Sequence, residues 1–97
     1  MTINKTTEGD TVVLSLTGWM DTQNASVLEQ ALSELEPDTR HLVLDLGGLE
    51  YTSSAGVRQL VAAHKRMSGE MTLRNVRKDV LDVLAMTGLT KKLHIEE

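Results

Sequence analysis

The chain has 97 residues, with 14 acidic and 10 basic side chains for a formal charge of -4, and it contains no Cys, no Phe, one Trp and one Tyr. This length favours one compact domain over residues 1–97, and the missing Cys excludes disulfide scaffolds and thiolate chemistry. An acidic balance with so few aromatic rings argues against direct nucleic-acid binding. No apolar run approaches the ~18 residues of a membrane span, so we expect a cytoplasmic protein without membrane insertion.

The N-terminal residues predict a hairpin of two strands. Residues 2–7 alternate weakly between polar and apolar side chains and reach a turn signal at Glu8-Gly9-Asp10. Residues 11–17 alternate with a period of two, as a half-buried strand does, and Gly18 closes this segment. The two segments together are typical of a hairpin.

Two helices with a strand between them are predicted next. Residues 24–35 carry an apolar stripe with helical spacing, and Pro37 ends this helix. Residues 41–46 form the most apolar strand candidate, as expected of a central strand, and Gly47-Gly48 give it a flexible exit. A second helix starts near Ser54 and stops before Gly69, because its apolar residues again follow the helical spacing.

The C-terminal part predicts a short strand and a third helix. Residues 71–73 form the strand, and a helical stripe over residues 80–85 is followed by a cap at Gly88. Residues 90–97 fit a strand, a helical turn or a tail. The order strand, strand, helix, strand, helix, strand, helix predicts an α/β or α+β domain with a mixed sheet covered by helices on at least one face.

This order of elements brings distant residues together. In parallel strands joined by helices, all the strand-to-helix loops leave at the same edge of the sheet, where such folds usually bind ligands. These loops are residues 18–24, 47–54 and 74–78. The polar side chains expected to converge at this edge are Asp21, Asn24, Ser53, Ser54, Arg74, Arg77 and Lys78.

Three consecutive hydroxyl side chains lead into the second helix. Ser53 or Thr52 is expected to cap it by accepting a bond from a free backbone N–H. Ser54 then occupies the first helical position, exposed, where the helix dipole tolerates a phosphate group. Asp21 is either a turn residue or a carboxylate beside Ser54. Arg74, Arg77 and Lys78 form either a solvated surface or a receptor for phosphate or acidic groups.

Enzymatic chemistry is not indicated. A nucleophilic Ser54 needs a base within hydrogen-bonding distance, but His64 lies ten residues further along the same helix, about 15 Å away at a rise of about 1.5 Å per residue. The scattered His residues make a poor metal site, and no glycine pattern matches a nucleotide-binding loop. We therefore expect no catalytic residue, no metal and no cofactor.

Three segments resemble a known family. Residues 18–21 (Gly-Trp-Met-Asp), 42–51 (Leu-Val-Leu-Asp-Leu-Gly-Gly-Leu-Glu-Tyr) and 52–58 (Thr-Ser-Ser-Ala-Gly-Val-Arg) look like a STAS domain of the anti-sigma factor antagonist type. The resemblance covers essentially the whole chain in order and spacing. It implies an α/β fold with a small mixed sheet of four to five strands, flanked by three to four helices.

The resemblance also implies a switch. Members of this family bind, when unphosphorylated, an anti-sigma factor that is often a serine kinase; this kinase phosphorylates a serine at the start of the second helix, and a serine phosphatase restores the binding form. The family motif aligns its acceptor with Ser54 and its usual Asp with Ser53, which makes Ser53 a rival acceptor. Asp21 matches the acidic residue of the first strand-to-helix loop. The residues expected to bind the partner are Asp21, Asn24, Ser53, Ser54, Gly56, Arg58 and Arg77.

Alternative functions remain open at this stage. Because Ser53 replaces the usual Asp, the chain is also compatible with a constitutive STAS accessory subunit of a transporter ATPase or of a larger signalling assembly. A nucleotide-hydrolysing domain is the weakest alternative. Trp19 and Tyr51, placed by this interpretation in loops at the binding edge, either anchor those loops or contact a partner.

Overall fold

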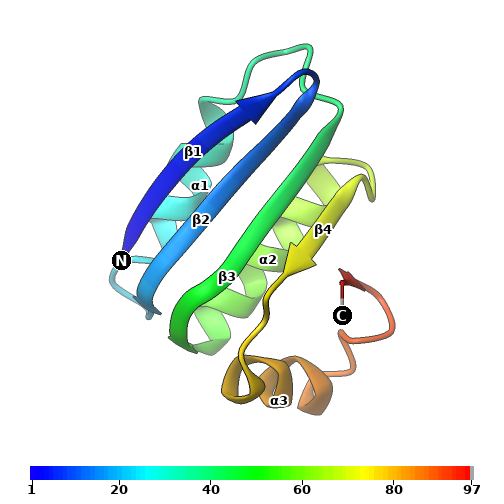
Figure 1. The fold of residues 1–97 in the computed structure, drawn as a ribbon. Coiled ribbons are helices and arrows are strands. Elements are labelled where there is room, and N and C mark those ends of the chain that lie inside the picture. The colour runs from blue at the N-terminus through cyan, green and yellow to red at the C-terminus, as the bar shows by residue number, and fades with distance from the viewer. Residues whose placement is uncertain (97) are drawn as a thin grey trace.

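The computed structural model describes residues 1–96 and contains five strands and three helices (Figure 1). In chain order these are β1 (Thr2–Glu8), β2 (Thr11–Met20), α1 (Ala25–Ser33), β3 (His41–Thr52), α2 (Ser54–Arg66), β4 (Met71–Arg74), α3 (Lys78–Met86) and β5 (His94–Ile95). The expected α/β fold, with a small mixed sheet flanked by helices, is confirmed. The C-terminal segment, left open by the sequence, contributes the two-residue strand β5.

The strands form one sheet in the order β1-β2-β3-β4-β5. The β1–β2 pair is antiparallel, as predicted for a hairpin, and the other three pairs are parallel. Figure 1 shows α1 and α2 behind the sheet, where they contact each other, and α3 near the end of β3. The carboxyl ends of β2 and β3 therefore point to the same end of the molecule, beside the start of α2.

The core lies between the sheet and the two helices behind it. Alternate strand residues such as Leu14 and Leu44 are fully buried and face α1 and α2, which contribute Leu28 and Leu60. The core is aliphatic throughout, consistent with the composition. On the opposite face of the sheet, side chains such as Asp45 stay partly exposed, because successive residues of a strand point to opposite faces.

Strands β2 and β3 are longer than the sequence predicted. The expected exit at Gly47-Gly48 is wrong, because β3 continues to Thr52, and Gly18 likewise lies inside β2. The pairing of β2 with β3 contains two irregularities, which carry both strands past these glycines. A Cβ at Gly48 would lie 2.9 Å from Thr17 Oγ1, so the absence of a side chain there lets the two strands stay paired.

The ends of the helices differ from the predictions by a few residues. α1 begins one residue after Asn24 and ends at Ser33, and Leu35 continues it only as a turn, its N–H donating to Leu32 O. The cap at Gly88 is confirmed. Gly88 has φ +75°, and the N–H of Leu89 donates to Leu84 O at 2.9 Å, which is the Schellman arrangement at the end of α3.

β4 covers only part of β3. Its last residue, Arg74, pairs with Asp45, so the rest of β3 has no strand on that side. α3 contacts β3 and buries Val80 and Leu84 in the common core. The end of β3 that leads into α2 is thus held by β2 on one side and supported by α3.

Candidate functional site

The ends of β2 and β3 bring two loops together. Met20 and Thr52 form the last pair between these strands, and both are buried. Beyond them, the N–H of Ser53 donates to Met20 O at 2.8 Å. The loop that starts at Asp21 therefore lies beside the start of α2, as the strand order predicted.

The loop between β2 and α1 is held by its own side chains. Asp21 Oδ1 accepts hydrogen bonds from the N–H groups of Gln23 and Asn24, each at 3.0 Å. Asn24 Oδ1 accepts from the Asp21 N–H at 2.8 Å, and Asn24 Nδ2 donates to Trp19 O at 2.9 Å. Asn24 thus fixes both the end of β2 and the position of the Asp21 carboxyl group.

Ser53 and Ser54 have different environments despite being adjacent. Ser53 is the N-cap of α2, and its hydroxyl accepts from the Gly56 N–H at 3.3 Å. It is only partly exposed. Ser54 is exposed at the first position of α2, and its hydroxyl has no hydrogen-bond partner within residues 1–96. The expected cap at Ser53 is confirmed, which leaves the Ser54 hydroxyl free on the surface.

Gly56 lies beneath this surface. It is buried, and a Cβ at this position would overlap Thr52 Oγ1 and lie 3.0 Å from Met20 Cε. Among the residues expected to bind the partner, Gly56 thus has no exposed surface to offer. Its contribution is to let the first turn of α2 approach the ends of β2 and β3 closely.

Arg58 lies one turn along α2 from Ser54. Its side chain is exposed and reaches back, with Arg58 Nε 3.5 Å from the Ser54 carbonyl oxygen. It forms no ion pair in the part of the chain that the structure describes, and the first turn of α2 contains no acidic residue. The surroundings of Ser54 on the helix are therefore neutral to positive.

The third loop contributes less than expected. Arg74 was predicted to converge with Ser54, but it pairs with Asp45 at 3.4 Å, seven residues before Thr52 on β3 and so roughly 20 Å from the end of that strand. This prediction is wrong because β4 stops early. Lys78 pairs within α3 with Asp82, also at 3.4 Å. Arg77 is the exposed N-cap of α3. Within residues 1–96 it has no hydrogen bond or ion pair to the Asp21 loop or to the start of α2.

Asp45 organises a clamp that the sequence analysis did not single out. In addition to Arg74, its carboxylate accepts from the Gly47 N–H at 3.0 Å and from Asn75 Nδ2 at 3.3 Å. Burial alone would raise the pKa of Asp45, but these hydrogen bonds and the Arg74 charge outweigh it and lower the pKa below 3.8. An Asp at the end of an apolar strand and two residues before a glycine was the available signal.

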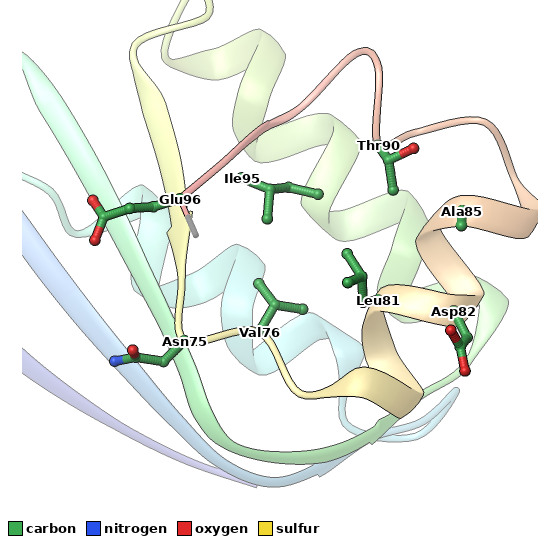
Figure 2. Close-up of a pocket in the computed structure, with 8 residues that line it drawn as sticks. All are labelled: Asn75, Val76, Leu81, Asp82, Ala85, Thr90, Ile95 and Glu96. Carbon is green, nitrogen blue, oxygen red and sulfur yellow. The ribbon is translucent and has the colours of Figure 1, made fainter.

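A pocket of about 580 Å³ lies away from the Asp21 loop and the start of α2 (Figure 2). In Figure 2 the side chains of Val76, Leu81 and Ile95 point toward one another between the end of β4, α3 and the C-terminal segment. Asp82 and Glu96 stand at its margin. None of the residues predicted for the site from the sequence lines it.

Two further observations concern residues 1–96. None of the helices has the length and hydrophobicity needed to cross a bilayer. No group of three or more His, Asp or Glu side chains is arranged to hold a metal ion.

Comparisons with known proteins agree with this fold. The chain matches the STAS domain family over residues 2–97. It is 33% identical over 81 residues to BtrV of Bordetella bronchiseptica, designated an anti-sigma factor antagonist, and the match covers 79% of this chain and 70% of BtrV. The chain belongs to the STAS domain family. Within that family it is of the anti-sigma factor antagonist type.

Solved structures share the architecture. An anti-sigma factor antagonist from Mycobacterium paratuberculosis superposes with a TM-score of 0.86 at 26% identity, covering 97% of this chain and 83% of that one. A Thermotoga maritima protein with the same designation superposes with a TM-score of 0.88 at 20% identity, covering 98% of this chain and 86% of that one. The fold also matches Bacillus SpoIIAA in its phosphorylated form, with a TM-score of 0.67 at 17% identity, covering 99% of this chain and 92% of that one. A sulfate transporter family protein from Wolinella succinogenes matches with a TM-score of 0.78 at 15% identity, covering 94% of this chain and 80% of that one.

Proposed function

We propose that this protein is a phospho-switched binding module. In its unphosphorylated form it binds an anti-sigma factor that has serine kinase activity; phosphorylation of Ser54 by that partner ends the complex, and a serine phosphatase restores the binding form. The observation that carries the proposal is the free, exposed hydroxyl of Ser54 at the first position of α2. The protein supplies no catalytic group in this scheme and acts as substrate and ligand of its partner.

The choice of Ser54 over Ser53 rests on their hydrogen bonds. A kinase must reach the hydroxyl and remove its proton, and Ser54 offers an exposed oxygen without an internal partner. Ser53 is partly buried, and its oxygen is committed to the Gly56 N–H. A kinase would have to take the Ser53 hydroxyl out of the cap of α2 before modifying it, whereas Ser54 needs no such change.

A phosphate on Ser54 is compatible with the folded chain. It would lie at the positive end of the α2 dipole, near backbone N–H groups that have no partner inside the helix. No acidic side chain of the first turn opposes it, and the exposed Arg58 side chain lies one turn away, with its Nε 3.5 Å from the Ser54 carbonyl oxygen. We therefore expect the phosphate to pair with Arg58 and to leave the helix intact.

The phosphate is expected to weaken the complex with the partner and not the fold of this chain. It adds roughly -1.5 to -2 charge in the middle of the proposed interface, where it must lose its water and where it occupies Arg58. A penalty of about 3 kcal/mol weakens binding more than a hundredfold, at about 1.4 kcal/mol per tenfold. The proposed interface comprises the exposed or partly exposed residues Asp21, Asn24, Ser53, Ser54, Arg58 and Arg77, with Gly56 supporting it from below.

Phosphosite mapping tests this proposal. Wild type, Ser54→Ala and Ser53→Ala are incubated with ATP and, one at a time, with purified serine kinases of the histidine-kinase-like ATPase fold from the same genome, followed by intact-mass measurement and peptide fragmentation. We expect one phosphate, on Ser54, in wild type and Ser53→Ala, and none in Ser54→Ala. Phosphate on Ser53 alone, or on neither serine with any kinase, would refute the mechanism.

A second candidate has one observation in its favour. The fold also matches a sulfate transporter family protein, and Ser53 stands where the antagonist motif commonly has Asp. A constitutive accessory subunit would bind its partner equally well with or without ATP, and Ser54→Asp would not weaken it. Binding assays with these kinases and with purified transporter ATPase subunits from the same genome, each with and without ATP, separate the two candidates.

A further inference from the structure

The aromatic side chains of this chain are concentrated at one place on its surface. Trp19 and Tyr51 are its only aromatic residues apart from histidine, and each is 54% exposed. They are direct partners in the register between β2 and β3. Two large apolar rings that remain this exposed in a chain with so few aromatics are unusual, because folding normally places such groups in the core.

These rings stand on a rigid support. Their strand neighbours Met20 and Thr52 are buried, so the alternation of the strands directs Trp19 and Tyr51 to the face opposite the helices. The Trp19 carbonyl accepts from Asn24 Nδ2, which fixes the end of β2. The backbone that carries the rings is thus fixed before any partner arrives, so binding needs to order only the two side chains.

The aromatic pair is continuous with the proposed interface. Tyr51 is three residues before Ser54, and Trp19 is two residues before Asp21. The loops that follow the two rings are joined by the hydrogen bond from the Ser53 N–H to Met20 O. A partner that covers Ser54 at the end of the sheet therefore lies next to both rings.

The charge beside the rings indicates what they bind. Glu50 has no register partner on β2, because the pairing shifts between Gly18 and Trp19, and it is exposed like its neighbour Tyr51. Asp21 is partly exposed, and neither carboxylate forms an ion pair within residues 1–96. Aromatic faces near carboxylates that have no ion-pair partner suit the guanidinium or ammonium group of a basic side chain, which stacks on a ring and pairs with the acids.

We infer that Trp19 and Tyr51 are the anchor of the partner interface and receive an arginine or lysine side chain of the anti-sigma factor, with Glu50 and Asp21 as its counter-charges. This inference rests on the proposed function and adds the contact that supplies affinity beside the switch at Ser54. Tryptophan and tyrosine at the centre of an interface commonly carry most of its binding energy.

The test measures the affinity of unphosphorylated variants for the purified kinase that modifies wild type. Trp19→Ala and Tyr51→Ala are each expected to weaken binding about tenfold or more. The matched control is Met86→Ala at the last residue of α3, an apolar side chain that is 86% exposed and outside the proposed interface, with a change within about twofold. Trp19→Phe and Tyr51→Phe should retain most of the affinity, which separates loss of the contact from loss of the fold.

A spectroscopic probe reports the contact directly. Because Trp19 is the only tryptophan, protein labelled with 5-fluorotryptophan gives a single ¹⁹F resonance. This resonance should shift when the kinase binds and return when Ser54 is phosphorylated.

The outcomes separate the two proposals. If wild type binds and is phosphorylated but both alanine variants bind equally well, the anchor is refuted and the switch stands. The anchor is also refuted if the rings only join two copies of this chain, seen as a dimer that Trp19→Ala dissociates without a change in kinase binding. If wild type binds none of the kinases, the proposed function fails and the anchor with it.

Discussion

The two halves of β3 perform different tasks within one strand. The first half ends at Leu46; it is paired with β2 on one side and, from Leu42 to Asp45, with β4 on the other, and its leucines are fully buried. The second half, from Gly47 to Thr52, is paired only with β2; it buries Leu49 and Thr52 but carries exposed side chains at Glu50 and Tyr51. The difference shows how a small domain presents a binding edge: a strand anchored in the core extends beyond its neighbour and carries the site on a rigid support.

The largest expected difference in stability is between a substitution at a core residue of β3 and one at a surface residue of the same strand. Leu44→Ala should lower the free energy of unfolding by about 2–5 kcal/mol, because it leaves a cavity between the sheet and α1 and α2. Tyr51→Ala, which removes a half-exposed ring, should change it by no more than about 1 kcal/mol. Urea unfolding of both variants measures the difference. Equal losses would mean that the Tyr51 ring supports the fold as much as the buried Leu44 side chain does.

The packing of α2 against the end of β3 is the next largest effect. Gly56→Ala introduces a methyl group that overlaps Thr52 Oγ1, so we expect a loss of about 1–3 kcal/mol. Ala62→Ser on the exposed side of α2 is the control and should change stability by less than about 0.5 kcal/mol. Thermal unfolding compares the two. A stable Gly56→Ala protein would show that α2 has room to move away from the strands.

The Asp45 clamp joins the two halves of β3 to the loop before α3. Asp45→Ala leaves the Gly47 N–H, Asn75 and Arg74 without their acceptor, and we expect a loss of about 1–2 kcal/mol at neutral pH. Asp38→Ala, at an exposed position, is the control with a loss of less than about 0.5 kcal/mol.

This clamp should also depend on pH. The folded protein lowers the pKa of Asp45 below 3.8, so in acid the unfolded chain binds the proton more readily than the folded one. The stabilisation is therefore present above pH 3.8 and is lost as the pH falls through the lower, folded pKa. The stability difference between wild type and Asp45→Ala should shrink in that window, whereas a difference that grows in acid would contradict the lowered pKa.

The smallest expected effects distinguish the two serines. Ser53→Ala removes the cap of α2 and should cost about 1 kcal/mol. Ser54→Ala removes an exposed hydroxyl without a partner and should change stability by less than about 0.5 kcal/mol. Thermal unfolding of both variants and of wild type measures the two losses, and each variant serves as the control for the other. The reverse order would indicate that Ser54, and not Ser53, caps the helix.

Much of this architecture was predictable from the sequence. The periods of two and 3.6 residues identified four strands and three helices in the correct order, and the hydroxyl run narrowed the cap of α2 to Ser53 or Thr52, of which the structure shows Ser53. The strand-to-helix geometry predicted that the Asp21 loop meets the start of α2. These features depend on local patterns or on the general rule that parallel strands end at one edge.

The second half of β3 was not predictable in the same way. Two adjacent glycines usually mark the end of a strand, and only the pairing with β2 shows that Gly47 and Gly48 lie inside one. Trp19 and Tyr51 were therefore assigned to loops, although they are paired residues on the neighbouring strands β2 and β3. The early end of β4, which takes Arg74 away from Ser54, depends on how α3 packs against β3, and no local pattern reports that.

The central claim is that Ser54 controls binding without changing the fold. Isothermal titration of the kinase partner with unphosphorylated protein and with protein enzymatically phosphorylated on Ser54 tests this claim directly. We predict that phosphorylation lowers the affinity by more than about a hundredfold, or about 3 kcal/mol. Equal affinities of the two forms would contradict the switch.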